Sequence, residues 1–361
     1  MRISKPAFYA FGVTAAAALL AACSGGGSPS SGMAPATGVN SSSVGQVRSL
    51  KERVTLTARV SKPLHKRHIK SWVAKDAGSV PRLLFVSDDG TNQVNMYTMP
   101  GLVLKGELTG FNEPQGMCSD AHGNIWVTDT GTASVIQLSR TGTVLNTVSD
   151  GIGFPVGCAV NKKTNDLAVT NIFNDTGSGA SVLVYTNSTG TPEEFSNPAD
   201  TEIFFPTYDG AGNLFVDGFG SSGFALAELA AGSTTLTNVS ISGGTLFFPG
   251  GLNWDSATSS LVIGDQECGG AGASCQYSAT VSGGVATITG STSLDDKSGL
   301  AAGDVDQAVL GPQGRYFAGG IISADSNASS VDRWAFPAGG VPTNFNDTTV
   351  VEPIGAAISN K

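Results

Sequence analysis

The chain has 361 residues, of which 29 are acidic and 20 are basic, and its formal net charge at pH 7 is −9. The charges are unevenly distributed: residues 48–75 hold nine basic side chains and one acidic one, whereas residues 76–361 hold nine basic and 28 acidic ones. A folded part with this acidic excess repels a polyanion, which excludes nucleic-acid binding. The 48 glycines and the few charged residues favour many short strands and turns over helices.

The first 22 residues are typical of a secretory signal peptide. Arg2 and Lys5 precede an apolar run over residues 7–20, which is shorter than the ~20 apolar residues that a membrane span needs. The run ends in Leu-Ala-Ala-Cys at residues 20–23. This tetrad resembles the lipobox of bacterial lipoproteins, and the resemblance implies that Cys23 is acylated and that Ser24 directs the protein to the outer membrane, facing the periplasm or the cell surface. The alternative is an ordinary signal peptide with an incidental cysteine.

Two segments separate the signal peptide from the folded part. Residues 23–47, which begin with the lipidated cysteine, are rich in Gly, Ser, Pro and Ala, and this composition predicts a flexible tether. Residues 48–78 form a basic arm, which is expected either to contact anionic membrane head groups or to lie against the acidic domain of its own chain. The membrane, reached through the lipid anchor, is therefore one expected partner.

The folded part, predicted over residues 79–361, repeats a short phrase. Its clearest copy is Glu-Pro-Gln-Gly at residues 113–116, followed by Ile-Trp-Val-Thr-Asp at residues 125–129. Such recurrence indicates a repeat architecture, and each copy reads as an antiparallel meander of four strands. The second strand of the repeat is expected at residues 83–86, 125–128, 167–170, 214–216, 261–263 and 316–318. Strands that open the repeats are expected to begin near Pro114, Pro155, Pro206, Pro249 and Val305.

The first repeat lacks an opening strand, and the end of the chain supplies one. Residues 352–357, Glu-Pro-Ile-Gly-Ala-Ala, have the pattern of residues 113–118, Glu-Pro-Gln-Gly-Met-Cys. A C-terminal strand that completes the first blade is one way in which a β-propeller closes its ring. We therefore predict an all-β fold, a six-bladed β-propeller of four-stranded antiparallel blades. Seven blades are the alternative if residues 54–60, which alternate apolar and polar side chains, belong to a further blade.

The phrase over residues 114–129 resembles the NHL repeat and the related repeats of the SMP-30/gluconolactonase group. The layout of the whole chain is similar to that of bacterial lipoproteins built from such propellers. This resemblance implies the fold and an envelope location. It implies no particular chemistry, because propellers of these kinds serve as binding platforms, lyases and hydrolases.

Four cysteines remain after Cys23, an even number in a compartment that permits disulfides. Cys268 and Cys275 flank a glycine-rich loop and are predicted to form one disulfide. Cys118 and Cys158 take nearly equivalent places in successive repeats and are predicted to form another across a blade interface. A zinc site is the competing interpretation, but only one histidine lies near a cysteine, which does not make a four-ligand set.

The residues just before each Pro-x-Gly are expected to form a ring at one mouth of the central channel. One half of this ring is acidic and the other half is aromatic. Its members are Glu352, Glu113, Phe154, Phe205, Phe248 and, in the sixth blade, Asp304 and Asp306. We predict a binding mouth for a ligand with a cationic or hydroxyl-rich end and an apolar end. The alternative is that the phenylalanines pack between blades while the acidic residues cap turns.

The resemblance to the gluconolactonase group would imply a divalent metal held partly by the residue between Pro and Gly. That position holds Gln115, Val156, Thr207, Gly250, Asp306 and Ile354. Only Asp306 is a good ligand for a hard cation, so we predict no metal and no other cofactor. No catalytic set is apparent either, because His122 is the only histidine of the folded part and no nucleophile elbow is present.

These observations predict a lipid-anchored, monomeric propeller that acts as a binding or interaction module for an unknown small molecule or protein. The alternative is a propeller enzyme of lactonase or lyase type. Such an enzyme would use the acidic half of the ring, formed by Glu113, Glu352, Asp304 and Asp306.

Overall fold

The computed structural model describes residues 70–361, apart from residues 152, 175–178, 271 and 323–328. All of the described residues belong to the unit Leu50–Lys361. The predicted signal peptide, Cys23, the tether, most of the basic arm and residues 54–60 lie outside them. Among the described residues, no helix has the length and the apolar composition that crossing a bilayer requires.

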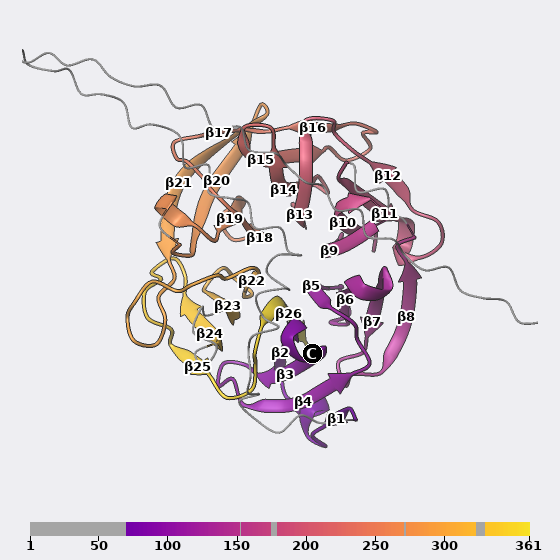
Figure 1. The fold of residues 1–361 in the computed structure, drawn as a ribbon, viewed down its shortest axis with the longest axis vertical. Helices are drawn as coiled ribbons and strands as arrows, with labels where there is room; N and C mark the ends of the chain where they lie inside the picture. Colours follow the sequence, from indigo (N-terminus) through magenta and orange to yellow (C-terminus); the bar gives the residue numbers. More distant parts are fainter. Residues whose placement is uncertain (1–69, 152, 175–178, 271, 323–328) are drawn as a thin grey trace, which may run out of the picture. The chain divides into compact units, whose positions relative to one another are not determined.

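Six β-sheets form the blades of a ring around a central channel (Figure 1). From the centre outward, blade 1 contains β26 (Pro353–Asn360), β2 (Arg82–Asp88), β3 (Gln93–Thr98) and β4 (Leu104–Thr109). Blade 2 contains β5 (Pro114–Ser119), β6 (Ile125–Asp129), β7 (Ser134–Leu138) and β8 (Val144–Ser149). Blade 3 contains β9 (Gly153–Val160), β10 (Leu167–Asn174), β11 (Ser181–Tyr185) and β12 (Glu193–Phe195).

The other three blades follow the same plan. Blade 4 contains β13 (Asp200–Tyr208), β14 (Leu214–Gly220), β15 (Gly223–Leu229) and β16 (Leu236–Asn238). Blade 5 contains β18 (Pro249–Asp255), β19 (Ser260–Asp265), β20 (Cys275–Ser282) and β21 (Val285–Ser293). Blade 6 contains β22 (Ala308–Leu310), β23 (Tyr316–Ile321), β24 (Ser330–Ala335) and β25 (Asn344–Asn346).

Short elements complete the described fold. Strand β1 (Trp72–Val73), which lies within the segment expected to be a basic arm, pairs antiparallel with β4 at the outside of blade 1. Strand β17 (Ser240–Ser242) pairs parallel with β21 at the outside of blade 5. Single turns of 3₁₀ helix are η1 (Ala77–Ser79), η2 (Asp89–Thr91), η3 (Thr130–Thr132), η4 (Thr186–Ser188) and η5 (Cys268–Gly270).

The prediction of a six-bladed propeller closed by the C-terminus is confirmed. Strand β26 pairs antiparallel with β2, so that Ala357 lies opposite Phe85 and Ala356 opposite Val86. The innermost strands contact one another in the order β26, β5, β9, β13, β18 and β22, and β22 contacts β26 again. The ring is therefore closed by strands from the two ends of the described chain.

The core lies between the blades, with one apolar cluster at each of the six interfaces. Side chains alternate along a strand, so each second strand contributes to two interfaces. In β2, Leu83 and Phe85 pack against blade 2, whereas Leu84 and Val86 pack against blade 6. A single blade cannot bury both of its faces, and the ring provides the second cover.

The glycine of the repeated Pro-x-Gly allows neighbouring opening strands to approach closely. A Cβ atom at Gly116 would lie 2.3 Å from the carbonyl oxygen of Val156, and one at Gly355 would lie 2.3 Å from that of Gln115. Any larger residue would push these innermost strands apart. The repeated phrase is thus a packing requirement of the channel wall.

Both predicted disulfides are confirmed. Cys118 of β5 is bonded to Cys158 of β9 across the interface of blades 2 and 3, with 5.6 Å between their Cα atoms. Cys268 is bonded to Cys275 within blade 5, with 5.8 Å between their Cα atoms. The first bond closes a chain segment of 40 residues and the second one of 7 residues.

Candidate functional site

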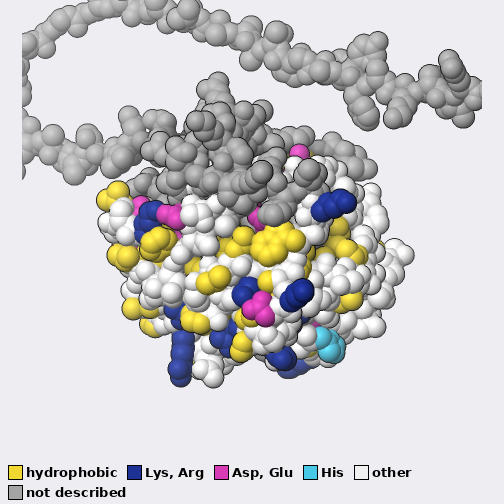
Figure 2. All heavy atoms as spheres, turned by 90° about the horizontal axis from the view of Figure 1, so that it is seen from below, with side chains coloured by type: hydrophobic (Ala, Val, Ile, Leu, Met, Phe, Trp, Pro, Cys, Tyr) yellow, Lys and Arg dark blue, Asp and Glu magenta, His cyan; other side chains and the backbone are white. Residues whose placement is uncertain are grey.

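The two ends of the channel are built from different residues, and charged residues of both signs, including Asp120, Asp166, Asp209 and Asp255, lie in or beside the turns at one of them. We call the end at which the innermost strands begin the opening end, and the end at which they lead into the second strands the turn end. Basic residues follow the innermost strands at the turn end: Lys162, Lys163, Arg315 and Lys361. His122, the only described histidine, lies in the turn between β5 and β6. The edge view in Figure 2 agrees, because Lys and Arg side chains gather along the lower edge together with the cyan histidine.

At the opening end, aspartates of the second strands hold the starts of the innermost strands. Each accepts a hydrogen bond from backbone N–H groups near the predicted ring. The bonds run from Val351 and Glu352 to Asp88 (3.0 and 2.8 Å), from Asn112 to Asp129 (2.6 Å), from Phe205 to Asp217 (2.8 Å), and from Phe247 and Phe248 to Asp265 (3.1 and 3.0 Å). These aspartates are buried and positioned by their strands, so they fix where the ring residues lie.

The acidic half of the predicted ring is brought together at the opening end. Burial, followed by the nearby charges of Glu113, Asp88 and Asp306, raises the pKa of Asp89 to about 7. The carbonyl oxygen of Glu352 accepts the backbone N–H of Asp89 at 3.0 Å. The sequence prediction of the ring did not include Asp89, which belongs to the turn η2 rather than to an opening strand.

The four predicted acidic residues differ in exposure. Glu352 and Asp306 are buried, whereas Glu113 and Asp304 are partly exposed. The backbone of Asp304 pairs with Ile322 next to β23. The exposed pair is therefore open to solvent, whereas the buried pair is not.

The aromatic half of the predicted ring packs together. Phe205 and Phe248 are buried and form a cluster with Phe204 and Phe219, whose ring centroids are between 5.2 and 6.3 Å apart. Phe154 is partly exposed and stacks on Phe173 at 5.0 Å. The rings fill the space between blades 3, 4 and 5. Packing between blades is the role that the sequence analysis gave as the alternative to a binding mouth.

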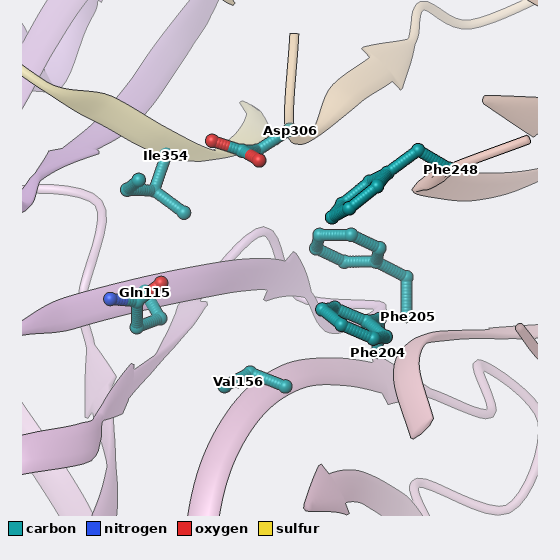
Figure 3. A pocket seen from close by; sticks show the side chains of 7 residues that line it. All are labelled: Gln115, Val156, Phe204, Phe205, Phe248, Asp306 and Ile354. Carbon is teal, nitrogen blue, oxygen red and sulfur yellow. The ribbon is translucent and has the colours of Figure 1, made fainter. Parts of the chain in front are cut away.

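A small cavity, which we call the opening-end cavity, lies between the two halves of the ring (Figure 3). Its volume is about 10 Å³, enough for about one water molecule. It is lined by Gln115, Val156, Phe204, Phe205, Phe248, Asp306 and Ile354. Phe205, Phe248 and Asp306 of the predicted ring thus reach it. The other four ring residues each precede a lining residue by two positions: Glu113, Phe154, Asp304 and Glu352.

The metal-ligand position of the gluconolactonase group also maps to this cavity. Gln115, Val156, Asp306 and Ile354 line it, whereas Thr207 lines a pocket at the turn end. Asp306 contributes the only carboxylate among the lining residues. Within residues 70–361 as described, no three His, Cys, Asp or Glu side chains are grouped so that they could hold a metal ion.

A much larger pocket, with a volume of about 520 Å³, opens at the turn end. We call it the turn-end pocket. Residues from all six blades form its wall, in the second halves of the innermost strands and in the turns that follow them. Sequence reasoning missed this pocket because it followed the starts of the opening strands, whereas the pocket is built from their ends.

Two aromatic residues stand on neighbouring blades in the wall of the turn-end pocket. Tyr208 ends β13 and Trp254 lies near the end of β18, and both are partly exposed. Burial, followed by the charge of Asp166, raises the pKa of Tyr208, so its hydroxyl group remains a hydrogen-bond donor at any physiological pH. Each residue therefore offers an apolar ring with a polar edge.

The charged residues of this wall leave a positive excess. Lys162 is exposed, and the ammonium group of Lys163 donates a hydrogen bond to the carbonyl oxygen of Gly210. Asp209 is the only acidic side chain among the lining residues. Its carboxylate already accepts hydrogen bonds from the backbone N–H groups of residues 211–213 and from the side-chain amide of Asn213, all between 2.7 and 2.8 Å.

Gln307 connects the innermost strands of three blades. It follows Asp306, which lines the opening-end cavity, and itself lines the turn-end pocket. Its side-chain oxygen accepts the N–H groups of Met117 and Ala356 at 3.0 Å each, and its side-chain nitrogen donates to the carbonyl oxygen of Met117 at 2.9 Å. One side chain of blade 6 thus ties the innermost strands of blades 2 and 1 across the channel.

The fold places the protein among the six-bladed β-propellers. The family model described as NHL repeat matches residues 111–138, which cover most of blade 2. A comparison of the sequence with curated proteins gave no match.

Two solved structures are similar in fold. A protein of unknown function from Bacteroides caccae is 14% identical, with a TM-score of 0.56 over 78% of this chain and 100% of the other. TolB from Acinetobacter baumannii is also 14% identical, with a TM-score of 0.54 over 78% of this chain and 67% of the other. At these identities the likeness concerns the fold alone.

Proposed function

We propose that the protein is a binding module of the bacterial cell envelope and that the turn-end pocket is its ligand site. The observation that carries this proposal is the difference in volume between the two ends of the channel, about 520 Å³ against about 10 Å³. Pockets of roughly 300–1,000 Å³ accommodate small organic ligands. The opening-end cavity admits one water-sized group, so a larger ligand fits only the turn end.

The wall of the turn-end pocket favours a small organic anion with an apolar face. Trp254 and Tyr208 offer ring surfaces, and Lys162 and Lys163 supply positive charge at the rim. The one carboxylate of the wall, Asp209, is satisfied by its own turn. An anionic ligand therefore meets donors and rings without facing an uncompensated negative charge.

A thermal-shift screen of uronic acids, sugar phosphates and aromatic carboxylates on residues 70–361 tests this proposal. Trp254→Ala and Lys162→Gln are expected to weaken any ligand found by about tenfold or more. Lys75→Gln is the matched control, because Lys75 is an exposed lysine that does not line the pocket. Ligands whose affinity falls equally in all three variants, or in none, would count against the turn-end pocket.

The envelope location rests on the N-terminal sequence. Acylation of Cys23 would anchor the chain through several acyl chains, which a stable membrane anchor requires, and residues 23–47 would serve as the tether. In cells that express the full chain, Cys23→Ser is expected to move the protein from the membrane fraction to the soluble fraction and to abolish labelling by a palmitate analogue. Labelling that persists in the serine variant would contradict the anchor.

The alternative is an enzyme of lactonase or lyase type that uses Glu113, Glu352, Asp304 and Asp306. Such an enzyme needs a substrate-sized space beside these residues, and the cavity there measures about 10 Å³. The geometry therefore favours a binding module over this alternative.

A further inference from the structure

The opening-end cavity contains a buried hydrogen-bond acceptor with nothing to accept from. The side-chain oxygen of Gln115 has no hydrogen-bond partner among the described residues, and only 1% of the residue is exposed. Gln115 and Asp306 both line the cavity, and Figure 3 shows them on the side away from the phenylalanines. Buried acceptors are nearly always satisfied by the protein, by water or by a ligand, so this oxygen indicates an occupant that donates hydrogen bonds.

The opposite wall of the same cavity is aromatic. Phe204, Phe205 and Phe248 line it. The face of an aromatic ring attracts a cation, and the attraction increases when water is excluded. The phenyl rings offer no hydrogen bonds, so this wall would gain little from a neutral donor such as water.

Asp306 lines the cavity and belongs to a group of acidic residues that repel one another. The charges of Glu113, Asp88 and Asp306, after burial, contribute to raising the pKa of Asp89. A cation bound beside Asp306 would offset this repulsion. The occupant is therefore expected to combine hydrogen-bond donors with a positive charge.

We propose that the opening-end cavity binds the primary ammonium group of an amine. An ammonium group has three donors and a positive charge, which match the oxygen of Gln115, the carboxylate of Asp306 and the phenylalanine faces. It is about the size of a water molecule and so fits a volume of about 10 Å³, whereas a quaternary ammonium head does not. This proposal does not depend on the proposed function, because the turn-end pocket is a separate cavity with its own lining.

The experiment compares methylammonium, tetramethylammonium and sodium chlorides at equal ionic strength on residues 70–361. Methylammonium, the smallest primary amine, is expected to raise the melting temperature and to give a saturable calorimetric signal, while the other two salts give neither. Asp306→Asn is expected to lower the methylammonium affinity about tenfold or more, and Gln115→Met, which removes the acceptor and nearly keeps the volume, is expected to lower it as well. Glu267→Gln is the matched control, because this acidic residue follows β19 at the opening end and does not line the cavity.

Two outcomes would overturn the proposal. If methylammonium acts on the wild-type chain no differently from sodium, the cavity holds water only. If Glu267→Gln weakens binding as much as Asp306→Asn, the amine responds to the general acidity of this end and not to the cavity. The comparison of salts uses the wild-type chain, so the test does not depend on how well a variant folds. Amine binding without any ligand at the turn end, or the reverse, separates this proposal from the proposed function.

Discussion

Asp332 is a buried carboxyl group whose ionisation opposes folding. It lies on β24 with 0% of its surface exposed. Burial is the main cause that raises its pKa to about 7; the charges of Asp296 and Asp347 act in the same direction, while Ser330 and Lys297 act against it. In the unfolded chain its pKa is close to 4. The folded protein therefore binds more protons between about pH 4 and pH 7, and the free energy of unfolding falls as the pH rises through this range.

Asp332→Asn is expected to remove this part of the pH dependence. The variant should be more stable than the wild type by roughly 2–4 kcal/mol at about pH 8, and nearly equal to it at about pH 3.5, where the wild-type carboxyl group is largely protonated in the folded and the unfolded chain. Urea unfolding at both pH values measures the difference. Asp76→Asn is the control, because the hydrogen bond from Lys105 lowers the pKa of Asp76 and places its titration below this range. An Asp332→Asn effect of the same size at both pH values would contradict the prediction.

The residues of the ring were predictable because each has a fixed place in the repeat. Glu113, Phe205 and Phe248 precede Pro-x-Gly or its equivalent, and the structure places them at the opening end as the repeat requires. Their surroundings were not predictable. The packing of Phe205 and Phe248 depends on Phe204 and Phe219, which stand outside the repeated phrase. Likewise, Trp254 and Tyr208 come to line one pocket only through the ring, because they lie 46 positions apart in two blades of otherwise different sequence.

At the scale of the element, the second strands follow the sequence closely. Strands β2, β6, β10, β14, β19 and β23 include every predicted second strand. They are buried on both faces, so they read as short apolar runs between turn residues. The short outer strands β1 and β17 were not predicted, because an outermost strand buries little and leaves a weak apolar pattern.

The opening strand of blade 6 shows where the repeat fails. It was expected near Val305, yet β22 begins at Ala308. This repeat lacks the Pro-x-Gly, and the backbone there bonds to blade 5 instead: the carbonyl oxygen of Asp306 accepts the N–H of Gly251 at 2.8 Å, and the N–H of Val305 donates to the hydroxyl of Ser274 at 3.0 Å. Asp306 then lines the opening-end cavity, and Gln307 lines the turn-end pocket. The least regular blade therefore supplies one residue to each cavity of the channel.

At the scale of the whole molecule, stability depends on how the ring is closed. Five blades are made from consecutive strands, whereas blade 1 combines β26 with strands from the start of the folded part. The ladder between β2 and β26 therefore joins the two ends of the propeller non-covalently. The disulfide between Cys118 and Cys158 joins blades 2 and 3. It therefore does not link β26 to β2.

Ending the chain after Glu352 is expected to prevent stable folding. The deletion removes β26 with the buried side chains of Ile354 and Ile358, and it leaves β2 without its inner partner. Two isoleucines at about 1.5–3 kcal/mol each and several ladder hydrogen bonds at about 1 kcal/mol each amount to roughly 10 kcal/mol, which is comparable with the total stability of a typical domain. Thermal melting followed by circular dichroism should show no cooperative transition, and gel filtration should show an expanded or aggregated chain.

Deleting only Lys361, which is exposed and follows β26, is the control and should leave the melting temperature nearly unchanged. A synthetic peptide of residues 349–361 added in excess should restore cooperative melting, because an extended strand can add to the free edge of β2. A shortened chain that melts like the wild type without the peptide would show that the ring does not need its C-terminal strand.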